Sequence, residues 1–193
     1  MNLAKKSLTL GVALSLAVGT LALMSPAARA ADGTITINGQ LTSATCSISV
    51  NGGGANYTVT LPTMQTSDFK AAGTAAGYTA FTIALSGCTA GSGSPAVTKV
   101  LPYFEQGPNT DLTSGYLQNV AATTPATGVE VMLSTGNTLA SALKLQNAAG
   151  AQGGAYATLS TNPSFTYYAA YVSTAAATAG LVNTSVQYDL SYQ

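Results

Sequence analysis

Histidine and tryptophan are absent from this 193-residue chain, and only 6% of its residues are charged. Without histidine the chain cannot build a Ser-His-Asp triad or most protein zinc sites. Lysine and arginine total six, and three of these lie within the first 30 residues, so the remainder carries a net charge of −3. This charge balance argues against nucleic-acid binding, which requires a surface patch rich in lysine and arginine. A surface with so few charges permits close association between copies of the chain.

Long apolar runs are lacking after residue 30, but one stands near the N-terminus. Lys5 and Lys6 precede an apolar stretch over residues 8–23, and Ala-Arg-Ala occupies residues 28–30. A charged start, a short apolar run and small residues at a cleavage position are typical of a secretory signal peptide. We therefore expect residues 1–30 to be removed on export, leaving 163 residues, enough for one domain. The alternative is an uncleaved membrane anchor, for which the run is short.

Cysteine is scarce, with only Cys46 and Cys88 in the chain. In an exported protein the default arrangement of two cysteines is one disulfide. A bond between these residues, 42 positions apart, would stabilise the fold by about 4 kcal/mol on the chain-entropy model. The alternative is two free thiols.

Alternating polar and apolar residues recur along the chain, in segments rich in β-branched and aromatic residues. This period-two pattern predicts β-strands, and it occurs at residues 34–41, 57–61, 78–85, 97–104, 128–133, 143–145, 165–172 and 182–192. Clusters of Gly, Asn, Ser and Pro separate the runs and indicate turns, and a short helical turn is expected within residues 67–77. Many short strands joined by turns favour an all-β sandwich of the immunoglobulin type.

Two short motifs resemble catalytic or cofactor sequences, but their surroundings argue against both. Ser141 and Lys144 match the S-x-x-K of serine acyl-enzymes, yet strand-like alternation would place them on opposite faces, and the K-T-G and S-D-N companions are missing. The sequence GSGSPA at residues 91–96 imitates a dinucleotide-binding loop, but Pro95 and a strand pattern follow it instead of a helix. We therefore expect no enzymatic activity, no cofactor and no metal site.

Each end of the expected mature chain holds a strand pattern without an evident partner. In ADGTITINGQL, residues 31–41, no two-residue turn follows to pair the run with a neighbour. In GLVNTSVQYDLSYQ, residues 180–193, the alternation continues to the last residue, so no later strand covers its free edge. Such an edge promotes aggregation unless something covers it. By pattern alone, residues 31–41 could equally be the first strand of their own sandwich.

These features together resemble the major-subunit family of chaperone–usher pili, the type 1 fimbrial pilins. The resemblance rests on the 31–41 segment with its glycine at position 39, on GQLTSATCSI leading into the first cysteine, on FTIALSGC carrying the second, and on Gly180 and Tyr192 near the C-terminus. It implies an incomplete immunoglobulin-like β-sandwich that lacks its last strand, with an N-terminal donor-strand extension at residues 31–41 and a pilin domain at 42–193. In donor-strand complementation, such an extension adds a strand to another subunit.

The resemblance also implies a function and a set of residues. The function is that of a structural subunit of a bacterial surface fimbria, which polymerises by donor-strand exchange; the alternative is a minor adaptor or tip-associated pilin involved in adhesion. The implied partners are neighbouring copies or related pilins, a periplasmic chaperone and an outer-membrane usher, with assembly on the extracellular surface after transit of the periplasm. The implied donor residues are Gly33, Ile35, Ile37, Gly39 and Leu41, although relatives often carry an apolar residue where Gly33 stands. The implied chaperone-recognition strand comprises Gly180, Val182, Thr184, Val186, Tyr188, Leu190, Tyr192 and Gln193.

Overall fold

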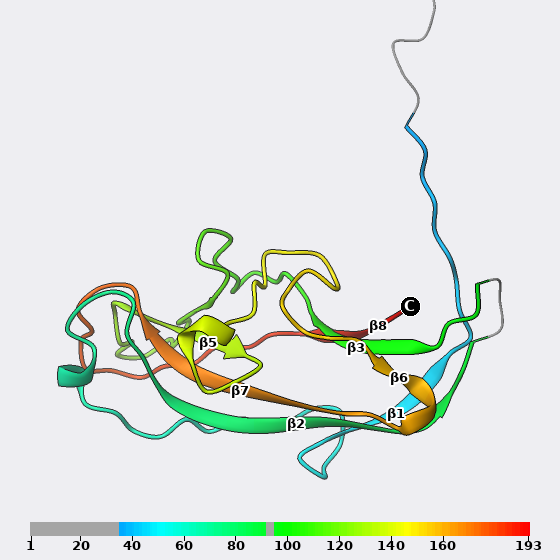
Figure 1. The fold of residues 1–193 in the computed structure, drawn as a ribbon. Helices are drawn as coiled ribbons and strands as arrows, with labels where there is room; N and C mark the ends of the chain where they lie inside the picture. The colour runs from blue at the N-terminus through cyan, green and yellow to red at the C-terminus, as the bar shows by residue number, and fades with distance from the viewer. Residues whose placement is uncertain (1–34, 92–94) are drawn as a thin grey trace, which may run out of the picture. The chain divides into compact units, whose positions relative to one another are not determined.

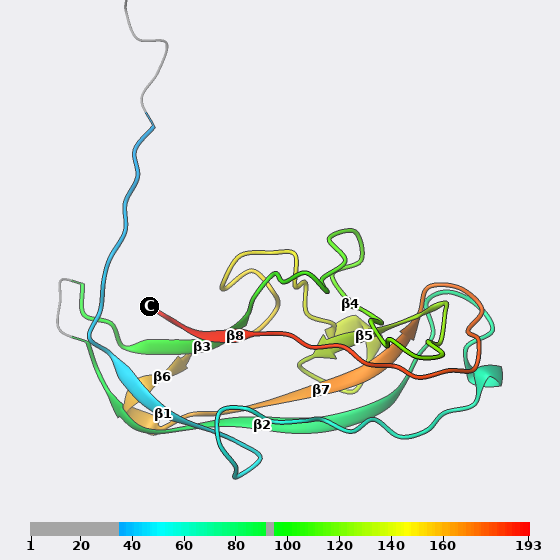
Figure 2. The same cartoon turned by 180° about the vertical axis from the view of Figure 1, so that it is seen from behind.

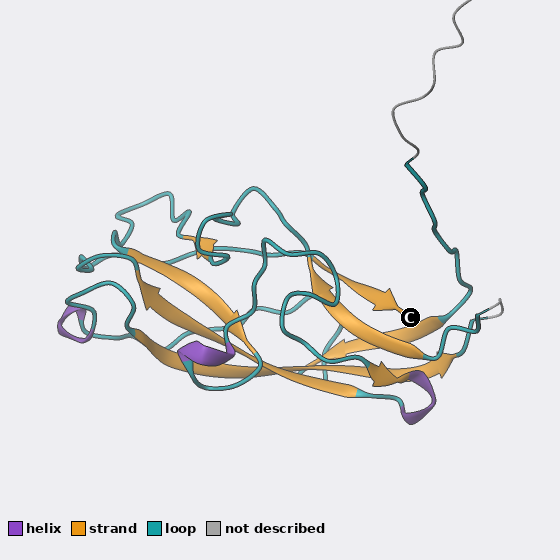
Figure 3. Ribbon diagram, turned by 45° about the horizontal axis from the view of Figure 1, so that its top comes forward, coloured by secondary structure: helices purple, strands orange, loops and turns teal. Residues whose placement is uncertain are grey.

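The computed structural model describes residues 35–91 and 95–193, and the chain divides into two units, Met1–Gly39 and Gln40–Gln193. The expected signal peptide and residues 31–34, which include Gly33, lie outside the described residues. The described part of the chain contains short helical turns and strands, and none of its helices is long and apolar enough to cross a membrane (Figure 3). The strands are β1 (Thr45–Val50), β2 (Ala75–Thr89), β3 (Lys99–Phe104), β4 (Leu117–Gln118), β5 (Val129–Ser134), β6 (Ala157–Thr158), β7 (Ser164–Ser173) and β8 (Tyr188–Tyr192), and the 3₁₀ turns are η1 (Thr66–Asp68), η2 (Leu139–Ser141) and η3 (Leu159–Thr161).

The strands of the Gln40–Gln193 unit form two antiparallel sheets packed as two layers. The larger sheet has the order β1-β2-β7-β5-β4, and the smaller has the order β6-β3-β8 (Figure 1; Figure 2 from behind). β2 and β7 run along the larger sheet, while β3 and β8 lie in the other layer. The predicted all-β, incomplete immunoglobulin-like sandwich is therefore confirmed.

The main core lies between the two layers, because period-two alternation sends every second side chain inward. Phe81, Ile83 and Leu85 of β2 are at most 7% exposed, and they pack in one cluster with residues of β3, β5 and β7. The rings of Phe104 and Tyr167 meet edge to face at 5.0 Å between centroids, a favourable aromatic geometry. β5 is buried on both faces, so its other side supports a second, smaller cluster.

The predicted disulfide is confirmed, and it ties β1 to β2. Cys46 and Cys88 are bonded, with their Cα atoms 4.2 Å apart, beside the pairing of β1 with β2. At the other end of β2 the pairing with β7 shifts register at Gly77, whose φ is +74°. A Cβ at this glycine would come within 3.0 Å of the Tyr171 ring, so both the backbone conformation and the close packing require glycine.

Four predicted strand runs differ from the structure. Residues 35–44 and 57–61 have no regular secondary structure, and the final run is a strand only over β8. Residues 143–145 form a loop, in which both leucines are at most 2% exposed and Lys144 is exposed. Alternation shows which face of a segment is apolar, but a strand also needs a hydrogen-bonding neighbour at the right distance. The helical turn expected within residues 67–77 is present nearby as η1, Thr66–Asp68.

Candidate functional site: an apolar groove between two unpaired edges

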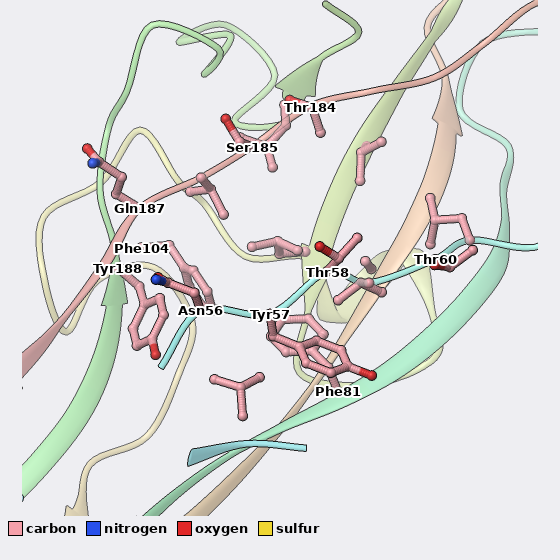
Figure 4. Close-up of a pocket in the computed structure, with 18 of the residues that line it drawn as sticks. Asn56, Tyr57, Thr58, Thr60, Phe81, Phe104, Thr184, Ser185, Gln187 and Tyr188 are labelled. Atoms are coloured by element: carbon pink, nitrogen blue, oxygen red, sulfur yellow. The ribbon is translucent and has the colours of Figure 1, made fainter. Parts of the chain in front are cut away.

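A groove of about 870 Å³ opens into the main core of the Gln40–Gln193 unit. One wall is the extended segment 55–61, and the other is the segment 182–188 that leads into β8. Figure 4 shows Tyr57, Thr58 and Thr60 on the first wall facing Thr184 and Ser185 on the second. Each wall is seven residues long, which corresponds to about 20 Å of extended chain.

The floor of the groove is the apolar core itself. It is formed by side chains from β2, β3, β4, β5 and β7, namely Phe81, Ile83, Phe104, Leu117, Val131, Leu133 and Ala169. No acidic or basic side chain is among the residues that line it. The groove therefore suits apolar side chains.

The 182–188 wall presents an unpaired backbone edge to the groove. On its outer side, Asn183 N donates to Asn119 Oδ1 at 2.9 Å, Asn183 O accepts from Val120 N at 2.8 Å, and Gln187 O accepts from Glu105 N at 2.9 Å. Since backbone groups alternate sides along an extended chain, the even-numbered residues point their N–H and C=O groups the other way. Among the described residues, none forms a hydrogen bond with the backbone of Val182, Thr184 or Val186.

The 55–61 wall presents a second free edge. Among the described residues, none forms a hydrogen bond with the backbone of residues 57–61. The two walls meet at one end, where Tyr188 Oη donates to Ala55 O at 2.8 Å. Between them, Thr184 Oγ1 is buried and has no hydrogen-bond partner in the described part of the chain. The apolar floor is therefore bordered by two backbone edges whose N–H and C=O groups are available for hydrogen bonding.

The predicted donor residues that the structure describes are exposed. Ile35 and Ile37 are each 90% exposed, and Leu41 is 98% exposed. A Cβ added to Gly39 would meet no atom within 4 Å, and the backbone there is not in the left-handed region, so the subunit's own fold does not require this glycine. These exposed large apolar residues all stand at odd-numbered positions, so in an extended chain they form one apolar face.

The predicted C-terminal recognition residues fall into three structural groups. Val182, Thr184, Val186 and Tyr188 line the groove, and Leu190 and Tyr192 lie in β8 and pair with β3. Tyr188 belongs to both groups, because it is also the first residue of β8 and pairs with Phe104. The Gln193 backbone continues this pairing, since its N–H donates to Lys99 O at 3.0 Å and its O accepts from Lys99 N at 2.8 Å. Gly180 lies elsewhere, against the backbone of residues 124–126, where a Cβ would collide with three main-chain atoms.

Sequence reasoning missed the 55–61 wall and the side chains that support the opposite wall. Residues 57–61 showed alternation, which was a usable signal for an apolar face but not for a groove. Asn119, which bonds both Leu181 and Asn183, carried no signal in the sequence. Of the two catalytic-looking residues, Ser141 donates its hydroxyl to Thr138 O at 2.7 Å, and the described residues hold no cluster of three His, Cys, Asp or Glu side chains that could bind a metal.

Charged groups lie beside the groove rather than in it. Glu105 lies next to Asp189, and a hydrogen bond between the two side chains, reinforced by charge repulsion, raises the pKa of Glu105 above its usual value. Burial raises the pKa of Tyr188 on the groove wall. The groove itself stays neutral near pH 7, so its affinity for an apolar strand should depend little on salt.

The fold and the groove define the class of this protein as an incomplete immunoglobulin-like β-sandwich, with an apolar opening between two free edges. Comparison with known proteins identifies the family. The family model FimA, described as "Type-1 fimbrial protein, A", matches residues 61–193. The chain is 41% identical over 169 residues to the major fimbrial subunit SMF-1 of Stenotrophomonas maltophilia (strain K279a), covering 86% of this chain and 95% of that protein. It is 39% identical over 181 residues to the F17 fimbrial protein of Escherichia coli, covering 91% of this chain and 96% of that protein.

This chain belongs to the type-1 fimbrial protein family, the subunits of chaperone–usher fimbriae. The crystal structure of the P pilus rod subunit PapA is similar at 20% identity and a TM-score of 0.46, covering 83% of this chain and all of that one. The family resemblance found in the sequence is thereby confirmed. Members of this family are structural subunits of fimbriae on the cell surface.

Proposed function

We propose that this chain is a structural subunit that polymerises by donor-strand exchange, with residues 31–41 of one copy filling the groove of the next. The observation that carries the proposal is the apolar groove bounded by two free backbone edges, at residues 57–61 and 182–186. A strand placed there can hydrogen-bond on both sides and bury its apolar face on the core. Residues 35–41 supply such a face, and their length equals that of each groove wall.

The energetics favour insertion of this segment. Ile35, Ile37 and Leu41 are almost fully exposed, and burying each side chain contributes roughly 1.5–3 kcal/mol before the ordering of the strand is subtracted. Backbone hydrogen bonds along the two edges add about 0.5–1.5 kcal/mol each. Gly39, which no contact in its own subunit requires, leaves one position of the donated strand without a side chain.

Transport to the surface raises a second need, because a subunit with an open apolar groove would aggregate. We propose that a periplasmic chaperone covers the groove along residues 182–192 until an outer-membrane usher brings two subunits together. The free edge of Val182, Thr184 and Val186 supports this assignment, since a chaperone strand can pair there as well. We propose that residues 1–30 direct the export that precedes this step.

Two substitutions of equal charge test the exchange. Ile37→Asp would bury an unpaired carboxylate in the groove, whereas Asn38→Asp makes nearly the same chemical change on the opposite face of the strand. We expect Ile37→Asp to abolish fibres seen by electron microscopy and Asn38→Asp to retain them, while circular dichroism shows both subunits folded. Fibres at wild-type abundance from Ile37→Asp would refute the proposal, as would loss of the folded subunit in that variant alone.

A further inference from the structure

The start of the last segment is held from its outer side by an asparagine side chain, next to a short backbone bridge in which Leu181 N donates to Thr124 O at 2.8 Å and Leu181 O accepts from Ala126 N at 2.9 Å. Asn119 Oδ1 accepts from Asn183 N at 2.9 Å and from Ala121 N at 3.1 Å. Asn119 Nδ2 donates to Leu181 O at 2.8 Å and to Ala126 O at 2.9 Å. A primary amide offers two donated protons and two acceptor lone pairs, so this side chain uses its whole hydrogen-bonding capacity here.

A second asparagine continues the same line of contacts. Asn109 Nδ2 lies 3.2 Å from both the backbone O and the side-chain Oγ of Ser185. Asn109 is itself attached to β4, because its O accepts from Gln118 N at 2.7 Å. Together with the bond from Val120 N to Asn183 O, these contacts engage the odd-numbered residues of the segment. The even-numbered residues remain available to the groove.

We propose that Asn119 and Asn109 form an asparagine clamp that positions the groove edge for the incoming strand of a second copy. This inference rests on the proposed strand exchange and names the residues that prepare its binding site. Beyond the bridge at Leu181, residues 182–187 make only two backbone–backbone hydrogen bonds with other described residues, to Val120 and Glu105. Without the asparagine side chains this segment would sample many conformations, and an incoming strand would have to order them. The clamp fixes the segment in advance, which lowers the ordering cost of association and slows release of the bound strand.

The clamp is tested with two Asn→Asp variants of the full chain, purified after export. Asn119→Asp keeps both acceptor positions but replaces the donor with a carboxylate oxygen that faces Leu181 O and Ala126 O. Asn147→Asp is the matched control, because Asn147 Nδ2 makes the same kind of bond, to Ala151 O at 3.1 Å, in a turn that does not line the groove. Both variants gain one negative charge.

The probe is a fluorescent peptide with the sequence of residues 31–41. We expect it to leave Asn119→Asp about tenfold faster than wild type, as loss of roughly two hydrogen bonds would give, and to leave Asn147→Asp at the wild-type rate. Hydrogen exchange of the filled subunit supplies a second readout. In Asn119→Asp, amide protection should fall at Val182, Asn183 and Thr184 while it stays unchanged at Phe81 and Tyr167, which pair between β2 and β7.

The outcomes separate the two proposals. Failure of wild type to bind the peptide would refute strand exchange itself. If wild type binds the peptide but Asn119→Asp releases it at the wild-type rate, only the clamp is refuted. A uniform loss of amide protection that includes Phe81 and Tyr167 would also refute the clamp. If Asn119→Asp does not fold, Asn109→Ala takes its place, with an expected release about threefold faster, since it removes one weaker contact; a wild-type rate there would overturn the clamp.

Discussion

The two faces of the larger sheet differ in how completely their apolar residues are covered. On the outer face, Met132, Ala170 and Val172 are at most 2% exposed, beneath Tyr78, Tyr116 and Ala142. On the inner face, which carries many more apolar residues, the main cluster stays open along a groove of about 870 Å³. Short loops thus suffice to close the smaller patch, while the larger one stays open. The opening is therefore a specific feature of the inner face and not a sign of loose packing throughout the domain.

The largest expected effect comes from two neighbouring core truncations, one on each face. Met132 faces the outer cluster and Leu133 lines the groove. Met132→Ala should lower the unfolding free energy by about 2–5 kcal/mol, equally with and without the 31–41 peptide. Leu133→Ala should lower the unfolding free energy by a similar amount in the subunit filled by the peptide. In the empty subunit the loss should be smaller, because the space left by the leucine joins the open groove. Denaturant unfolding with and without saturating peptide measures both differences.

This pair of variants tests the comparison directly, because each acts as the control for the other. In Leu133→Ala the stabilisation that the peptide provides should shrink, whereas in Met132→Ala it should match that of wild type. Equal weakening of peptide binding by both variants would mean that the two faces respond as one core, and the contrast between them would not hold.

A smaller effect is expected at the buried hydroxyl of the groove wall. Thr184 Oγ1 has no partner among the described residues, and an unsatisfied buried polar atom destabilises by about 1–3 kcal/mol. Thr184→Val keeps the shape of the side chain, so it should raise the stability of the empty subunit by about 1 kcal/mol. Thr60→Val on the opposite, exposed wall position is the control and should change little. A less stable Thr184→Val subunit would show that the hydroxyl is bonded in solution.

The sandwich could be predicted from the pattern of residues, whereas an open groove beside residues 182–192 was implied only by the family resemblance, and its 55–61 wall was not foreseen. Period-two alternation and two cysteines were enough for β2, β3, β5, β7 and the Cys46–Cys88 bond, because these features depend on local pattern and simple pairing. The same alternation at residues 57–61 predicted a strand that the structure lacks, since pairing depends on what the fold places alongside. Gly180 was singled out by resemblance, but its packing against residues 124–126 is a tertiary contact. Asn119 acts through four backbone groups that only the fold brings together.

The smallest expected effect concerns Glu130, a buried carboxyl on the outer face of the larger sheet. Glu130 is 9% exposed and accepts from Ser114 Oγ at 3.0 Å. Burial raises the pKa of Glu130 above its usual 4.5, with a further contribution from the Asp111 charge and a partial offset from the Ser114 bond. Nearby, the Thr113 backbone N–H bonds Asp111 Oδ1 at 2.7 Å and lowers the pKa of Asp111.

These two shifts have opposite consequences for stability, and their pH windows differ. A carboxyl whose pKa is raised by folding contributes stability that is full below the unfolded pKa and is lost as the pH rises through the folded value. Glu130 should therefore make the subunit more stable near pH 4.5 than near pH 7.

Asp111 contributes stability above its unfolded pKa, and this contribution is lost only as the pH falls below about 3.9. Between pH 4.5 and 7 the contribution of Asp111 stays constant, whereas the contributions of Glu130 and of Glu105, whose pKa is also raised, both change. Glu130→Gln, which keeps an acceptor for Ser114 without a charge, should therefore reduce the change in melting temperature across that range and raise the melting temperature slightly at pH 7. The groove has no titrating carboxylate in its lining, so release of the 31–41 peptide should be the same in wild type and Glu130→Gln at both pH values. A change in peptide release with Glu130→Gln would show that the two faces of the sheet are coupled, and that Glu130 on the outer face influences the shape of the groove on the inner face.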